Sequence, residues 1–121
     1  MVAEKIYDLL DAGLPKTIGD LPSTTKDAVA IMEYDGYDST EYLGMKTSVF
    51  QPVVKIVART NDYSRGSSWV DSIAEQLHKH SDGDFMSILL VGTPVYLGRD
   101  EQKLHEFQVT FRTQVRSDFY G

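Results

Sequence analysis

The chain places Gln51-Pro-Val-Val-Lys-Ile-Val-Ala-Arg59 directly before Ser68-Trp-Val-Asp-Ser-Ile-Ala-Glu-Gln-Leu-His-Lys79, with a polar turn between them. Both alternating sets of side chains in the first segment are partly apolar, which predicts an interior β-strand. Pro52 has no amide proton to donate, so we expect it among the strand's first residues or beside a solvent edge. The second segment repeats apolar residues at helical spacing, which predicts a helix that packs on the sheet.

Two further elements are predicted before this unit. An apolar stripe in 2–10 indicates a short helix, which Gly13 helps to end. Lys16 to Lys26 has no period and is rich in turn formers, so we expect a loop. Residues 28–34 read as a strand that stops at the turn dipeptide Asp35-Gly36.

Two more strands are predicted after the helix of 68–79. Residues 85–91 form an almost continuous apolar run, which is typical of a strand buried on both faces. Residues 95–97 form only a short extended piece. Residues 106–116 alternate strictly, with Phe107 and Phe111 on the apolar side, so one face of this strand belongs to the core.

The order helix, strand, strand, helix, strand, strand predicts an α+β fold. We expect a single domain over 1–121, built as a two-layer sandwich in which both helices cover one face of a four-stranded mixed sheet. The opposite face would be too apolar to be merely solvated and too charged to be core. That mixture favours contact with another chain.

The segment from Tyr37 to Ser48 has no clean period, although it carries large apolar side chains. Its two readings are an ordinary hairpin connection and a contact arm that a partner covers. Together with the mixed sheet face, it supplies the candidate interface residues: Tyr37, Tyr42, Met45, Lys55, Arg59, Gln108, Thr110, Arg112 and Arg116.

Composition excludes several classes of function. The net charge of −6 argues against general nucleic-acid binding, which relies on Lys and Arg to neutralise phosphates, and we expect no sequence-specific nucleic-acid binding. The absence of cysteine excludes disulfides and thiol chemistry. No apolar run reaches the roughly 20 residues that a membrane-spanning helix needs, so we expect no membrane contact.

No catalytic or metal-binding motif is present. His78 and His80 point to different sides of a helix, and His105 is remote, so solvent-exposed histidines are favoured over a metal site. Phosphate-binding loops, nucleophile elbows and dinucleotide fingerprints are absent, and no cofactor is predicted. A dispersed catalytic site is not excluded by missing motifs.

The run Val53–Arg59, the turn 61–63 and the helix 69–77 resemble the centre of the tail terminator and minor capsid proteins of long-tailed (siphovirus-type) bacteriophages. Leu21-Pro22, the segment Pro94-Val-Tyr-Leu-Gly-Arg-Asp-Glu101 and the final strand Phe107-Gln-Val-Thr-Phe111 follow in the family's order. The resemblance matches Arg59 to a recurring strand-end arginine. The alternative for Arg59 is a surface ion pair with Asp62 or Glu75.

The resemblance implies a structural protein of the virion without enzymatic activity, made in the host cytoplasm. It would form a homohexameric ring that caps the tail tube protein, stops its polymerisation and joins the tail to the head–tail connector protein. Two alternatives from other classes are a small phage or bacterial hydrolytic enzyme and a monomeric protein-binding module.

Overall fold

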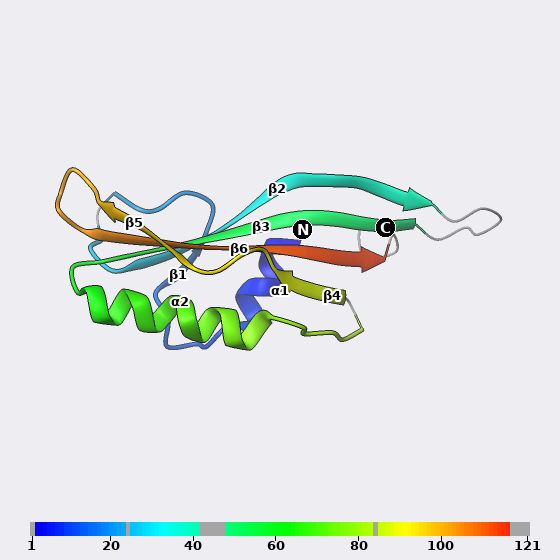
Figure 1. Ribbon diagram of the computed structural model, residues 1–121, viewed down its shortest axis with the longest axis horizontal. Coiled ribbons are helices and arrows are strands. Elements are labelled where there is room, and N and C mark those ends of the chain that lie inside the picture. The colour runs from blue at the N-terminus through cyan, green and yellow to red at the C-terminus, as the bar shows by residue number, and fades with distance from the viewer. Residues whose placement is uncertain (1, 24, 42–47, 84, 117–121) are drawn as a thin grey trace.

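A computed structural model describes the chain over 2–23, 25–41, 48–83 and 85–116 (Figure 1). Within these ranges it leaves the side chains of 35–41, 48–50, Met86 and Arg116 undescribed. The elements are α1 (Val2–Leu9), β1 (Lys16–Ile18), β2 (Ala28–Glu41), β3 (Ser48–Thr60), α2 (Tyr63–Leu77), β4 (Phe85–Leu90), β5 (Val95–Arg99) and β6 (His105–Arg116).

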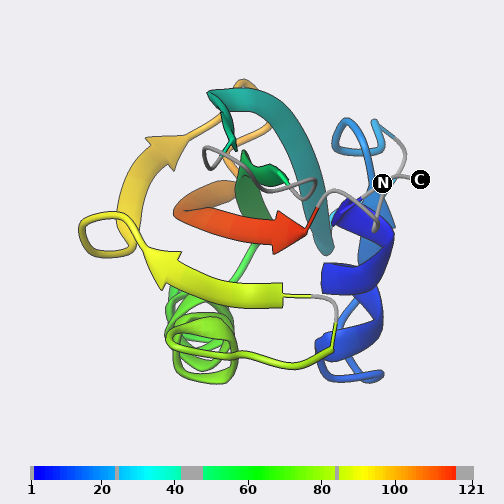
Figure 2. The ribbon, with the colours of Figure 1, turned by 90° about the vertical axis from the view of Figure 1, so that its right-hand side faces the viewer.

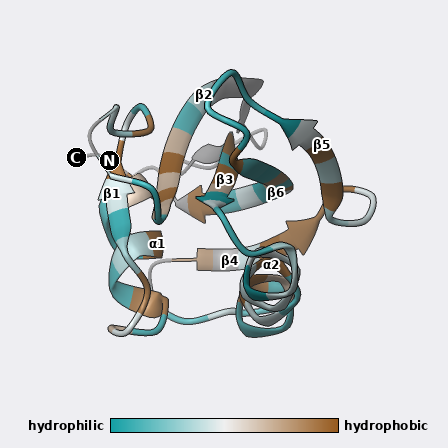
Figure 3. Ribbon diagram, turned by 90° about the vertical axis from the view of Figure 1, so that its left-hand side faces the viewer, coloured by the Kyte–Doolittle hydropathy of each residue, from teal (hydrophilic) through white to brown (hydrophobic). Residues whose placement is uncertain are grey.

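The fold is α+β, with two helices and a six-stranded mixed sheet. The strands lie in the order β1-β2-β3-β6-β4, and β5 also pairs with β6. β1 runs parallel to β2, whereas the other pairs are antiparallel. The first half of β6 pairs with β5 and its second half with β4. β1 and the pair β4 and β5 therefore form opposite margins of the sheet (Figure 3).

The prediction of four strands is wrong because β1 and β5 are also strands. β1 has only three residues, too few to show a period, and it lies where a loop was expected. β5 covers the segment read as a short extended piece, and it becomes a strand by pairing with the distant β6. Both strands are defined by their partners and not by their own sequence pattern.

Both helices pack on the same side of the sheet, as predicted (Figures 1 and 2). Val2 and Ile6 of α1 and Ile73 and Leu77 of α2 belong to one apolar core. The sheet contributes the alternate residues of its strands, and those of β6 follow the predicted pattern: Phe107, Val109, Phe111 and Val115. One side of the sheet is therefore closed, and any contact surface of the sheet lies on the other side or at its margins.

Helix α2 begins at Tyr63, earlier than the predicted start at Ser68. Asp62 caps it, since its carboxylate accepts from the Arg65 amide at 3.3 Å. Gly66 is needed here because a Cβ at this position would collide with the Phe107 ring. The predicted apolar stripe is confirmed, with Val70, Ile73 and Leu77 buried.

Strands β2 and β3 form a long hairpin with irregular pairing. The pairing register shifts between Tyr34 and Tyr37, so Asp35-Gly36 interrupts the ladder without ending the strand as predicted. Pro52 is buried inside β3, opposite this irregularity, and not at the strand's start or beside a solvent edge. An irregular ladder tolerates a proline because some backbone groups are left out of the pairing.

Strand β4 is buried on one face only, contrary to the prediction. Phe85 and Ile88 are buried in the core, whereas Leu89 is exposed on the opposite face. Its outer edge is closed by the segment that follows α2. The Lys79 amide donates to the Ile88 carbonyl at 2.7 Å, and the Ile88 amide donates to the His80 carbonyl at 3.1 Å. β4 therefore offers no free backbone along this part of its edge.

Candidate assembly surface

The sheet face opposite the helices carries four of the nine predicted interface residues. Gln108, Thr110 and Arg112 alternate with the core residues of β6, so they lie on this face, and all three are partly exposed. Lys55 of β3 pairs with Thr110 and lies in the same row across the sheet. Its ammonium group lies 5.2 Å from the centre of the Tyr34 ring in β2. A polar and basic band thus crosses the middle of this face.

Arg59 does not belong to this exposed band. Only 7% of its surface is exposed, and its guanidinium donates to the carbonyls of Pro22 and Thr25. The surface ion pair with Asp62 or Glu75, which was the alternative for Arg59, is absent from the described interactions, where Arg65 lies 4.0 Å from Asp62. Arg59 instead holds the connection between β1 and β2 against the sheet.

The same connection is fixed a second time beside Arg59. Thr60 Oγ1 donates to Asp27 Oδ1 at 2.8 Å, and Arg65 Nη1 donates to Asp27 Oδ2 at 2.9 Å. Val57, which lies on the same face of β3 as Lys55, is buried near this end of the sheet. Since neighbouring Ala28 and Ala30 are buried too, the open part of the face begins at Lys55 and Met32.

An aliphatic ridge borders the open face at the margin formed by β4 and β5. It consists of four side chains with 41 to 49% of their surface exposed, and we call it the β4–β5 ridge: Leu89, Val91, Val95 and Leu97. Leu89 pairs with Arg112 and Val95 with Gln108, while the Val91 amide donates to the Thr110 carbonyl. The ridge therefore runs alongside the polar residues of β6.

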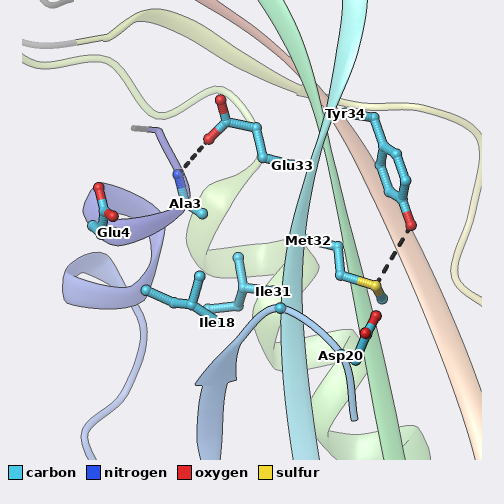
Figure 4. Close-up of a pocket in the computed structure, with 9 residues that line it drawn as sticks. Ala3, Glu4, Ile18, Asp20, Ile31, Met32, Glu33 and Tyr34 are labelled. Atoms are coloured by element: carbon cyan, nitrogen blue, oxygen red, sulfur yellow. Dashed lines mark hydrogen bonds between the residues drawn. The ribbon is translucent and has the colours of Figure 1, made fainter.

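A groove of about 310 Å³ lies at the other margin, between α1 and the turn after β1, and we call it the β2 groove (Figure 4). Its apolar lining comes from Ile18, Ile31, Met32 and Tyr34. Carboxylates also line it: Glu4, Asp20 and Glu33. Glu33 accepts a hydrogen bond from the Ala3 amide at 2.9 Å, which ties the start of α1 to β2. The groove is thus apolar and acidic.

The structure does not describe the side chains of the other four predicted interface residues. Tyr37 lies in β2 and Arg116 in β6, but their side chains are not described. Tyr42 and Met45 lie outside the described residues. Their roles as interface residues stay predictions.

The three histidines are dispersed over the molecule. The Leu90 amide donates to His78 Nδ1 at 3.0 Å, His80 Nε2 lies 2.8 Å from Asp82 Oδ2, and His105 Nδ1 lies 2.8 Å from the Tyr96 hydroxyl. Among the described residues, no group of three or more His, Cys, Asp or Glu side chains is arranged to hold a metal ion. Nor does this part of the chain contain a helix long and apolar enough to cross a membrane.

The ridge and the groove were not found from the sequence. Leu89 and Val91 belong to an apolar run that predicted burial on both faces, so their exposure could not be inferred. The Val-Tyr-Leu pattern of β5 was a possible signal, because a short apolar segment between turns can be an edge strand. The groove joins α1, β1 and β2, which only the tertiary fold brings together.

Comparison with known families gives one match over nearly the whole chain. The model of a family described as bacteriophage tail terminator protein matches residues 2–116. A comparison with curated proteins finds no match. The matched range contains every element of the fold, including the ridge, the groove and the open sheet face.

Proposed function

We propose, from the premise that this chain belongs to the bacteriophage tail terminator family, that it ends the tail tube as a homohexameric ring. Membership makes the protein a structural, non-enzymatic component of the virion tail that interacts with the tail tube. In the proposed assembly, six copies form the ring, which contacts the head–tail connector protein on the side away from the tube. The protein is made in the host cytoplasm. The junction between tail and head is its proposed place.

The observation that carries the proposal is the family match over residues 2–116. The open sheet face supports it, because a protein that acts by binding needs a surface that differs from ordinary solvated surface. This face combines the cations Lys55 and Arg112 with exposed Tyr34 and a bordering row of aliphatic side chains. We assign the face to contact with neighbouring subunits or with the tube.

Tube polymerisation tests the capping function directly. The tube protein of the same phage is polymerised with and without this protein, and tube lengths are measured by electron microscopy. We expect shorter tubes that carry a ring at one end. Tubes of equal length with and without the protein would contradict the capping function.

Charge reversal tests the role of the open face. Arg112→Glu and Lys55→Glu should fold as the wild type, since both side chains are partly exposed and surface substitutions usually change stability by less than about 0.5 kcal/mol. Both should weaken ring formation or capping, and the wild-type assembly should weaken with added salt because exposed charges are screened. Asp71→Lys, on the exposed side of α2, is the matched control. Wild-type capping by both variants would move the contact to another surface.

A further inference from the structure

We propose that the β4–β5 ridge of one copy docks in the β2 groove of the next copy and so closes the ring. The inference rests on the proposed ring and names the two surfaces that meet. These surfaces lie at opposite margins of one sheet. Contact between two different surfaces of identical subunits repeats from copy to copy and forms a ring when the rotation closes.

The groove lies beside a stretch of β2 that has no outer partner strand among the described residues. β1 ends at Ile18, which pairs with Ile31, whereas β2 continues to Glu41. Beyond Ile31, the outer edge of β2 has no paired strand in the described part of the chain. Ile18 and Tyr34 are both exposed at this position. A segment from another copy can therefore cover apolar side chains there without displacing any helix or strand in the described ranges of this one.

The ridge is shaped to enter such a groove with its side chains. Leu89, Val91 and Val95 lie beside alternate residues of β6, which places them about 7 Å apart along one line. The pairing of β5 is irregular between Tyr96 and Gly98, so only a short part of its outer edge is regular. A strand of another copy could pair with only a few residues of this edge. We therefore infer that the aliphatic side chains supply most of the contact.

The charges of the two surfaces are complementary. The carboxylates of Glu4, Asp20 and Glu33 line the groove, and none of the other described residues that line it is Lys, Arg or His. Arg112 pairs with Leu89 at one end of the ridge, and the exposed Arg99 follows Leu97 at the other. Groove against groove would bring carboxylates together, which opposes that self-pairing. Ridge against groove brings opposite charges together.

Cysteine cross-linking tests the contact cleanly, because the natural sequence contains no cysteine. Ile18→Cys and Val95→Cys are prepared as separate proteins, mixed on tail tubes of the same phage and treated with a short bismaleimide. We expect a cross-linked dimer from the mixture and none from either variant alone. A chain with both substitutions should give a ladder of bands up to the closed ring. The pair Ser68→Cys with Val95→Cys, which moves one thiol to α2, should give no dimer.

Charge exchange provides a second readout. Asp20→Arg and Arg99→Asp should each raise the dissociation constant between subunits about tenfold or more, and the double variant should recover a large part of this loss. The inference is overturned if tubes are capped without an Ile18–Val95 cross-link, or if Ile18→Cys cross-links with itself. Those results leave the capping function standing. Absence of capping by the wild type contradicts the proposed function itself.

Discussion

Gly66→Ala should destabilise this protein although the residue lies inside a helix. An exposed helical Gly→Ala change ordinarily gains up to about 1 kcal/mol. Here a Cβ on Gly66 would lie 2.3 Å from Cε2 and 2.6 Å from Cδ2 of Phe107, and 3.0 Å from Cγ2 of Thr60. Carbon atoms normally approach to about 3.5 to 4.0 Å, so the ring must move by more than about 1 Å.

The Phe107 ring has little room to make that movement. It is buried in the core, and its centre lies 5.2 Å from the Tyr63 ring and 5.1 Å from the Tyr96 ring. Overpacking typically costs about 1 to 3 kcal/mol, and we expect the upper part of this range. After subtraction of the gain in helix propensity, Gly66→Ala should lower the free energy of unfolding by about 1 to 2 kcal/mol. The melting temperature should fall by roughly 4 to 8 °C.

Urea unfolding followed by circular dichroism measures this change, with linear extrapolation to water. Ser68→Ala, an exposed position of the same helix, is the control and should change stability by less than about 0.5 kcal/mol. In a Phe107→Leu background the smaller side chain leaves room for the added methyl group, so Gly66→Ala should cost less there. Equal or higher stability of Gly66→Ala in the natural background would refute the close-packing argument.

Three further predictions concern buried positions. Leu77→Ala should cost about 2 to 5 kcal/mol, because the side chain is fully buried and leaves a cavity; an unchanged urea midpoint would contradict its core position. Thr113→Val keeps the shape of the side chain but removes the hydroxyl that donates to the Pro52 carbonyl at 2.9 Å, so stability should fall by about 1 to 3 kcal/mol in the same assay. Arg59→Lys cannot reproduce the guanidinium's contacts, and amide hydrogen exchange in the connection between β1 and β2 should accelerate while α2 stays protected; equal exchange rates in both proteins would show that Arg59 does not hold this connection.

Local periodicity was sufficient to predict the elements that form the core. The stripe of α2 and the alternation of β6 each repeat over enough residues to identify the buried side. These two patterns also placed Gln108, Thr110 and Arg112 correctly on the face opposite the core. Their position follows from the two-residue period of a strand and needs no knowledge of distant contacts.

Nonlocal contacts account for what the sequence did not predict. From the sequence, Arg59 is a surface cation at a strand end. In the structure it is buried, because its guanidinium donates to the carbonyls of Pro22 and Thr25, which lie more than 30 residues earlier in the chain. Leu89 reads as core because its neighbours are apolar, although only one face of β4 is covered. The β2 groove exists because β1 stops at Ile18 while β2 continues, and strand pairing determines that difference.

The position of β6 has a consequence for how the protein is made. β6 is the last of the described strands in the sequence, yet it lies inside the sheet and pairs with β3, β4 and β5. Until residues 105–116 have left the ribosome, β3 has an open edge and β4 and β5 lack their partner. Open edges of this kind pair with other chains. Newly made chains are therefore prone to aggregate until β6 has left the ribosome and paired, and a chain cut before His105 cannot complete the sheet.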